Sequence, residues 1–203
     1  MTGNPETLST QQRFQHLVAV ISSERFLKMQ GLGNEVPFFI CPFSPKEAVE
    51  LARTVDQLIR RLEQQGIQVL KIDLYDLSIG LLQTRGIWER VLAIEEATPK
   101  AQLLELLQNV LDPEHHLVPA IARKMDERPF DVMFICGVGE VFPFIRSHTV
   151  LNNLQSAAQD RPTVMFFPGT YTQSLETGAS LDLFGILHDD KYYRAFNIFD
   201  VYV

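Results

Sequence analysis

Short, almost wholly apolar runs alternate along the chain with longer segments in which apolar residues recur every three or four positions. The short runs are typical of strands buried on both faces, and the longer segments are typical of amphipathic helices. The apolar runs predict four strands, at residues 36–43, 68–74, 131–136 and 163–167. A strand, a helix and a second strand follow one another within residues 36–74, which predicts a right-handed βαβ unit.

The segment between the first two strands carries the clearest helical signals. Ser44 precedes Pro45, and Glu47 lies three positions after Ser44, which is the pattern of a capping box with proline in the first turn. The helix is predicted to run to about Gln65 and to end at Gly66. Its apolar side is predicted to comprise Val49, Leu51, Ala52, Val55, Leu58, Ile59 and Leu62.

Further helical patterns lie near the N-terminus and between the second and third strands. Residues 8–30 predict two helices, and residues 75–126 predict several more that together form a helical insertion. A helix is also expected after the third strand, with Ser147 as its N-cap. The remaining predictions are a turn at residues 168–171, a polar, mobile loop at 171–180, a short strand or a turn of helix at 181–187, and a terminal helix at 191–199.

These elements predict one α/β domain over residues 1–203, with a mostly parallel sheet of four or five strands flanked by helices. The arrangement resembles a degenerate nucleotide-binding fold of the P-loop or Rossmann-like kind with a helical insertion. A P-loop requires glycines and a Lys-Ser/Thr pair, but the loop after the first strand has no glycine, and its prolines lack amide donors. Gly137-Val138-Gly139 lacks the third glycine of a dinucleotide motif. ATP or NAD chemistry is therefore not expected.

Polar and charged side chains gather after the third predicted strand, which Gly137 and Gly139 follow at once. Ligands of α/β sheets bind at the carboxyl ends of the strands, so we predict a recess between Gly139 and His148 that binds a ligand or a partner side chain. Alternatively, Glu140 and Arg146 form an ion pair that braces the loop, or they cap the neighbouring helix. The candidate partner- or ligand-binding residues are Glu140, Arg146, His148, Asn152 and Tyr171, the last closing the recess from the fourth strand.

Two pairs of reactive side chains are adjacent in sequence. Ser147 and His148 would diverge on a helix, and no G-x-S-x-G motif accompanies them. His115 and His116 fall in the first turn of a predicted helix, where side chains face each other only at spacings of three or four. We interpret them as exposed residues near a helix cap. We therefore expect no catalytic residue, no bound metal, no cofactor and no enzymatic activity.

Composition and charge narrow the functional classes further. The chain has 203 residues, 46% of them hydrophobic, and its net charge is −7 with a pI near 5.2. The densest basic spots, Arg60-Arg61 and Arg123-Lys124, are flanked by acidic residues. Because non-specific binding to duplex DNA depends on a basic face, strong direct DNA binding is not expected.

Cysteine use and hydropathy bear on the compartment. Cys41 and Cys136 each lie in an apolar run, which favours buried free thiols over the alternative of a disulfide. No C-x-x-C pair is present. The N-terminus lacks the basic and apolar regions of a signal peptide, and no run approaches the roughly 20 apolar residues that span a bilayer. We expect no membrane association and a cytoplasmic location.

Six segments distributed over nearly the whole chain carry a further pattern. They are residues 23–27, 31–40, 137–148, 150–155, 165–171 and 192–196. In order and spacing they resemble the BrxB family of bacterial BREX systems, which distinguish host from phage DNA by methylation and block phage replication. The resemblance implies a small accessory subunit beside a methyltransferase, a large ATPase and PglZ, a protein of the alkaline-phosphatase-like class. It implies contact with other BREX subunits, PglZ first, and supplies no established catalytic residues.

The leading expectation is a non-catalytic accessory or adaptor subunit of an anti-phage complex that acts through protein–protein contacts. The alternative is a small-molecule or nucleotide sensor that uses the recess between Gly139 and His148. Direct DNA binding is a third possibility that the acidic composition disfavours.

Overall fold

The computed structural model describes residues 8–31, 37–174, 178–185, 187–188 and 195–202. The α-helices are α1 (Thr10–Ile21), α2 (Glu24–Leu27), α3 (Ala48–Glu63), α4 (Leu74–Thr84), α5 (Trp88–Glu95), α6 (Lys100–Val110), α7 (Val118–Glu127) and α8 (Ser147–Leu154). Three short helices are η2 (Pro45–Glu47) and η4 (Ile198–Asp200), both 3-10, and the π-helix η3 (Pro113–Leu117). The strands are β1 (Phe38–Phe43), β2 (Val69–Asp73), β3 (Val132–Cys136), β4 (Thr163–Ser174), β5 (Gly178–Leu183), β6 (Leu187–His188) and β7 (Ala195–Asn197).

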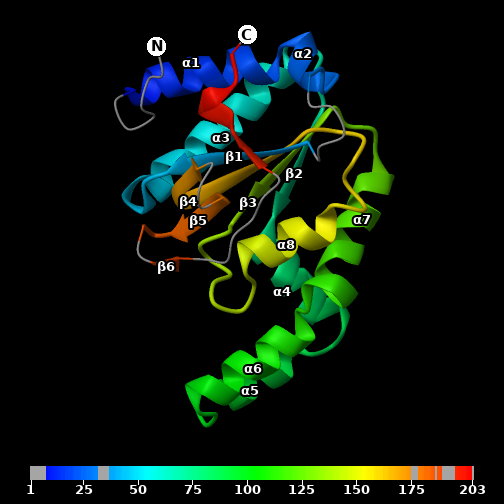
Figure 1. Ribbon diagram of the computed structural model, residues 1–203. Coiled ribbons are helices and arrows are strands. Elements are labelled where there is room, and N and C mark those ends of the chain that lie inside the picture. Colours follow the sequence, from blue (N-terminus) through cyan, green and yellow to red (C-terminus); the bar gives the residue numbers. More distant parts are fainter. Residues whose placement is uncertain (1–7, 32–36, 175–177, 186, 189–194, 203) are drawn as a thin grey trace.

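Five strands form a parallel sheet in the order β2-β3-β4-β1-β7 (Figure 1). The chain runs from β1 through α3 to β2, which lies beyond β3 and β4, and then returns one strand at a time to β4. Strands β1 and β4 are neighbours, but the chain continues from β1 to the β2 edge of the sheet and from β4 toward the β7 edge. The predicted α/β domain with a mostly parallel sheet is confirmed, and its topological switch point lies between β1 and β4.

Helices cover both faces of this sheet. Helices α1 and α3 lie on one face, and α4, α7 and α8 lie on the other (Figure 1). Successive residues of a strand point to opposite faces, so Phe38 and Ile40 join the core beneath α4, α7 and α8, whereas Phe39 and Cys41 join the core beneath α1 and α3. None of the four is more than 3% exposed. Strand β1 is therefore buried on both faces, as its unbroken apolar run predicts.

The start of α3 differs from the predicted capping box. A 3-10 turn comes first, so α3 begins at Ala48, and the side chain of Ser44 makes no capping hydrogen bond. The carboxylate of Glu47 instead forms an ion pair with Arg13 of α1, with 3.2 Å between Nη1 and Oε2. Val49 and Ala52, both predicted on the apolar side, are exposed, Val49 to 74%.

Strand β4 continues well beyond its predicted end. Its first half pairs in parallel with β1 and β3, and its second half, from Gly169 to Ser174, pairs antiparallel with β5. The turn predicted at residues 168–171 is therefore wrong. The loop predicted at residues 171–180 is also wrong where the structure describes it, and residues 175–177 lie outside the described residues.

The side chains explain why this part of the chain stays extended. Thr170 and Thr172 are exposed while Tyr171 between them is buried, which is the alternation of a strand with one covered face. Threonine and tyrosine both favour strands. The antiparallel partner β5 satisfies the backbone, and this long-range pairing outweighs the local turn signal of Pro168 and Gly169. Of the two options at residues 181–187, the strand is confirmed by β5, which ends at Leu183.

The predicted C-terminal helix is replaced by a short edge strand and a 3-10 turn. Strand β7 pairs in parallel with the start of β1, so that Phe38 lies opposite Ala195. Helix η4 follows at once, and Ile198 and Phe199 are buried beneath α1. Pairing with β1 explains why these residues are extended. Residues 191–194 of the predicted helix lie outside the described residues.

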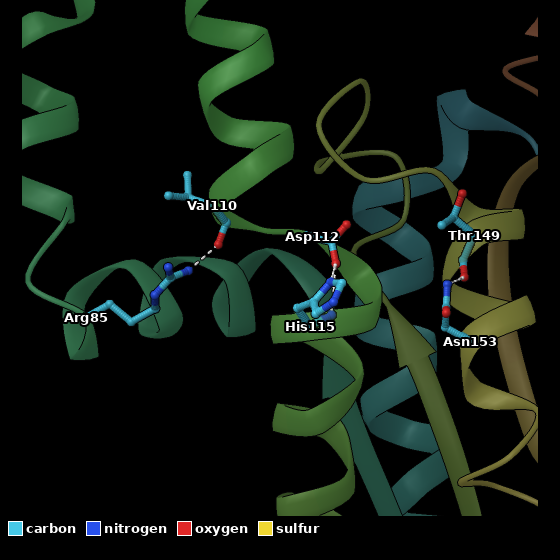
Figure 2. A network of polar contacts seen from close by, with 6 residues as sticks. All are labelled: Arg85, Val110, Asp112, His115, Thr149 and Asn153. Carbon is cyan, nitrogen blue, oxygen red and sulfur yellow. Dashed lines mark hydrogen bonds and ion pairs between the residues drawn. The ribbon is translucent and has the colours of Figure 1, made fainter.

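The helical insertion comprises α4, α5, α6, η3 and α7. Helices α5 and α6 extend away from the sheet (Figure 1). Each has one buried residue, Val91 in α5 and Leu107 in α6. At the base of this pair, the guanidinium of Arg85 donates a hydrogen bond to the carbonyl of Val110 (Figure 2). The chain breaks between these helices around Arg85, since α4 ends at Thr84 and α5 begins at Trp88.

Candidate functional site

A cavity of about 280 Å³ opens at the carboxyl ends of β1 to β4, beside the topological switch point. We call it the α3 cavity, because the first two turns of α3 form one of its walls. Its apolar lining includes Phe43, Leu51, Val55, Phe166, Pro168 and Phe184, and its polar lining comprises Lys71, Asp73, Cys136 and Glu140. In open α/β sheets this is the place where ligands bind.

Asp73 is fixed in this cavity by its place at the end of β2. Its Oδ1 accepts hydrogen bonds from the backbone N–H groups of Tyr75 at 3.0 Å and Asp76 at 3.2 Å, so it caps α4. The end of β3 packs directly against this carboxylate. Gly137 has φ of 73°, and a Cβ atom there would lie 2.6 Å from Oδ1 of Asp73. Glycine is therefore required for the ends of β2 and β3 to approach each other.

Lys71 and Cys136 occupy the polar side of the cavity between Asp73 and α3. The ammonium of Lys71 contacts Oδ1 of Asp56 on α3 at 2.8 Å, and this hydrogen bond raises the pKa of Lys71. Burial raises the pKa of the Cys136 thiol to about 12. A thiol with such a pKa is protonated at neutral pH and is a poor nucleophile. Cys41 and Cys136 are both free thiols, as predicted. Cys41 is buried, whereas Cys136 is half-buried.

Glu140 lies at the exposed mouth of the α3 cavity. Its pKa is raised, first by partial burial and then by the negative charges of Asp73 and Asp76. The turn that carries Glu140 passes close under the hairpin, because a Cβ on Gly139 would lie 2.9 Å from Pro168 and 3.2 Å from Phe184. Two carboxyl groups, those of Asp73 and Glu140, therefore line a mainly apolar cavity, and Asp76 lies close enough to act on Glu140.

Phe184 stands at the same mouth in an unusual backbone conformation. Its φ is 57°, which is rare for a bulky residue, and it is 36% exposed. Two hydrogen bonds hold the turn: the N–H of Phe184 donates to Pro168 O at 2.8 Å, and the N–H of Gly185 donates to Asp182 O at 3.0 Å. The ring of Phe184 meets Phe142 edge to face at 6.2 Å. The surrounding structure thus holds an exposed aromatic ring in place.

A second hollow of about 600 Å³ adjoins the first and shares Phe43, Pro45 and Phe184 with it. We call it the hairpin cavity, because the β4–β5 hairpin lines one side. Arg13 lines the other side, where it donates to Pro42 O at 3.0 Å and lies 5.5 Å from the ring centre of Phe199.

The five candidate residues do not converge on one recess. Glu140 lines the α3 cavity, and Tyr171 lines the hairpin cavity, where its hydroxyl donates to Ala195 O at 2.6 Å. Arg146, His148 and Asn152 lie on or beside α8 and line neither cavity. Sequence reasoning missed Asp73 and Phe184. The acidic residue at the strand–helix junction could have revealed Asp73, whereas Phe184 gave no local signal.

The start of α8 also differs from its prediction. Arg146, which is exposed, takes the N-cap position and makes no side-chain capping bond. Ser147 is instead the first helical residue and is buried, and its Oγ has no hydrogen-bond partner among the described residues. Farther along, Nδ2 of Asn153 donates to Thr149 O at 2.8 Å within the helix (Figure 2).

The connection between β1 and α3 occupies the place where a nucleotide-binding fold of this kind would hold phosphate. The N–H of Glu47 donates to Ser44 O at 2.8 Å, and the N–H of Ala48 donates to Pro45 O. These two amide donors are thus engaged inside the 3-10 turn.

Of the two neighbouring histidines, His115 forms an ion pair with Asp112. His115 Nδ1 lies 2.7 Å from Oδ1 of Asp112 at the exposed start of η3 (Figure 2), and this contact raises the pKa of His115. Within the described part of the chain, no group of three or more His, Cys, Asp or Glu side chains is placed to hold a metal ion. No helix among the described residues is long and apolar enough to cross a membrane.

Comparisons with known proteins give a consistent result. A family model described as "BREX protein BrxB" matches residues 70–198. The chain is 34% identical over 191 residues to the BREX protein BrxB of Bacillus cereus (strain H3081.97), covering 93% of this chain and 97% of that protein. It is 28% identical over 186 residues to the BREX protein BrxB of Escherichia coli O9:H4 (strain HS), covering 92% and 90%. No solved structure matches the chain.

Proposed function

Because the chain belongs to the BrxB family and is thus a component of a BREX phage-defence system, we propose that it is a non-catalytic adaptor. In this role it holds other BREX subunits together by protein–protein contacts in the cytoplasm. The proposed leading partner is PglZ, and a role beside the methylation and restriction machinery follows from that placement.

The observation that carries the proposal is the construction of the carboxyl edge of the sheet. The connection after β1 holds its amide donors in a 3-10 turn, and Pro42 and Pro45 contribute none. In place of a phosphate site there are two adjoining hollows with apolar walls and an exposed ring, Phe184, between them. Aromatic residues beside apolar pockets are typical of protein interfaces.

Affinity purification from cells that express the complete BREX operon tests the adaptor function. With the tag on this chain, PglZ is expected to co-purify in a fixed ratio that survives gel filtration, and the tag alone should retain none. The purified chain should release no phosphate from ATP above background with Mg²⁺. Failure to retain any BREX subunit, or Mg²⁺-dependent phosphate release that persists through repurification, would contradict the proposal.

A second candidate function, a small-molecule or nucleotide sensor, is favoured by the position of the α3 cavity at the switch point. A ligand at 100 times its Kd stabilises a fold by about 2.7 kcal/mol. For a chain of this size that corresponds to a rise in Tm of roughly 5–11 °C. A nucleotide panel that produces such a shift would support the sensor, and unchanged melting curves would favour the adaptor.

Fluorescence anisotropy with labelled duplex DNA tests the third function, direct DNA binding. Since the net charge is −7, affinity for duplex DNA should be weak and lost near physiological salt. Tight binding at moderate ionic strength would require a basic surface that the adaptor role does not use.

A further inference from the structure

We propose that the α3 cavity binds the side chain of an arginine carried by a short segment of another BREX subunit. The inference rests on the proposed adaptor function and identifies the surface and the partner chemistry that would serve it. Four features of the cavity carry it: its divided lining, its charge, the ring at its mouth and its size.

The lining is divided between apolar and polar sides. Phe43, Leu51 and Phe166 belong to the apolar side, and Asp73 and Glu140 belong to the polar side at the ends of β2 and β3. An occupant that matches both sides is itself amphipathic. Arginine has an apolar stem and a planar cationic head with several donors, so it can pack along one side and donate to the other.

The charge at the mouth favours a cation. Asp73 and Asp76 both act on Glu140, whose raised pKa reflects burial first and then their like charge. Lys71, the cation of the cavity lining, is engaged by Asp56 of α3 at 2.8 Å. A guanidinium beside Glu140 would relieve the repulsion among the three carboxyl groups. Such charge complementarity selects a basic partner over an acidic one.

Phe184 supplies a surface on which a guanidinium can stack. Phe184 is 36% exposed at the mouth, and its φ is 57°. Two hydrogen bonds hold this conformation: the N–H of Phe184 donates to Pro168 O, and the N–H of Gly185 donates to Asp182 O. A non-glycine residue held in this region is strained, and such strain clusters at ligand clamps. Arginine over an aromatic face gains further attraction.

The size of the cavity limits the occupant. At about 280 Å³ it lies at the small end of the roughly 300–1,000 Å³ that is typical of small-molecule sites. One long side chain fits this space, whereas a whole nucleotide would extend beyond it. A side chain presented by a protein segment is therefore a better match than a free cofactor.

The first experiment tests the side-chain chemistry with defined probes. N-acetyl-arginine amide is titrated into the isotope-labelled protein, and N-acetyl-citrulline amide, which has the same shape without the charge, is the matched control. We expect NMR signals of Gly139 and Phe184 to shift with the arginine probe and to stay unchanged with citrulline. Glu140→Gln should weaken the arginine response about tenfold. Equal responses to the two probes, or shifts confined to other surfaces, would overturn the proposal.

The second experiment uses the complex itself, purified from the complete operon with the tag on this chain. Glu140→Gln and Phe184→Gly should each lower the retained partner about tenfold or more. Phe184→Gly relieves the positive φ, which offsets the lost ring contact with Phe142, so the variant should still fold and unfold cooperatively while losing the partner. Glu95→Gln, an exposed change on α5, is the control and should retain the partner fully.

The outcomes of the second experiment separate this inference from the proposed function. If partner recovery is equal in the wild type and all three variants, the α3 cavity is not the docking site, although the adaptor function stands. If the wild type itself retains no BREX subunit, the adaptor function fails and this inference fails with it.

Discussion

Gly137→Ala should destabilise the protein by an amount that follows from the contact between the ends of β2 and β3. At φ of 73° an alanine enters the left-handed region, which costs an L-residue roughly 1–2 kcal/mol. Its Cβ would lie 2.6 Å from Oδ1 of Asp73, the atom that caps α4. Displacing that oxygen costs about 0.5–2 kcal/mol of capping energy. The two costs together amount to roughly 1.5–4 kcal/mol.

Two other glycines provide matched controls. Gly66 has φ of 84°, but a Cβ atom there would have no neighbour within 4 Å, so Gly66→Ala should show the left-handed cost alone. Gly80 lies inside α4 with open space around it, so Gly80→Ala should stabilise the protein by up to about 1 kcal/mol.

Urea and thermal denaturation followed by circular dichroism would rank the three variants. Since 1 kcal/mol shifts Tm by roughly 2–4 °C in a chain of this size, Gly137→Ala should melt roughly 3–16 °C below the wild type. The order of stability should be Gly80→Ala, wild type, Gly66→Ala and Gly137→Ala. If Gly137→Ala proves as stable as Gly66→Ala, the close approach to Asp73 contributes nothing and the reasoning is refuted.

Three further predictions concern separate parts of the molecule. Thr163→Val should raise the free energy of unfolding by roughly 1 kcal/mol, because Oγ1 of Thr163 is buried without a hydrogen-bond partner among the described residues; a lower urea midpoint would contradict this. In an NMR titration His115 should show a raised pKa, and Asp112→Asn should return it toward the ordinary value. The protonated ring and the carboxylate stabilise the fold at intermediate pH; the contribution is lost as pH rises through the raised pKa of His115, and again as pH falls through the lowered pKa of Asp112. If the pKa of His115 is the same in the wild type and in Asp112→Asn, Asp112 does not raise it and the prediction is wrong. Arg146→Ala should cost the fold no more than about 0–1 kcal/mol yet weaken binding to PglZ by about 2 kcal/mol or more; an unchanged melting curve with undiminished binding and full phage defence would exclude Arg146 from the interface.

The parallel sheet could be predicted because each of its first four strands is a short apolar run, and burial on both faces leaves that mark in the sequence itself. The hairpin could not, because Pro168 and Gly169 give a local turn signal, whereas their pairing with Phe43 of β1 and Leu183 of β5 keeps them extended. The same reason applies to β7, which is extended by its pairing with β1. Long-range pairing decides such segments, and local propensity does not report it.

The sequence indicates where the candidate site lies more readily than it indicates which residues form the site. Glu140 can be placed at the carboxyl edge, because the glycines after a buried strand mark that edge. Asp73 and Phe184 come from β2 and from the β5–β6 turn, and only the strand order brings them beside Glu140. Sequence proximity assigns His148 to the same recess, but α8 carries it to a separate place.

The position of β1 between β4 and β7 governs how the chain can fold during synthesis. Phe38 pairs with Thr163 on one side and with Ala195 on the other. Both partners leave the ribosome long after β1, so an apolar strand with two unpaired edges must wait through most of translation. Exposed edges of this kind invite pairing with other chains, and such contacts of high sequence separation form slowly. Newly made chains should therefore depend on chaperones or on low expression rates, and truncation before β7 should yield aggregates rather than a smaller folded protein.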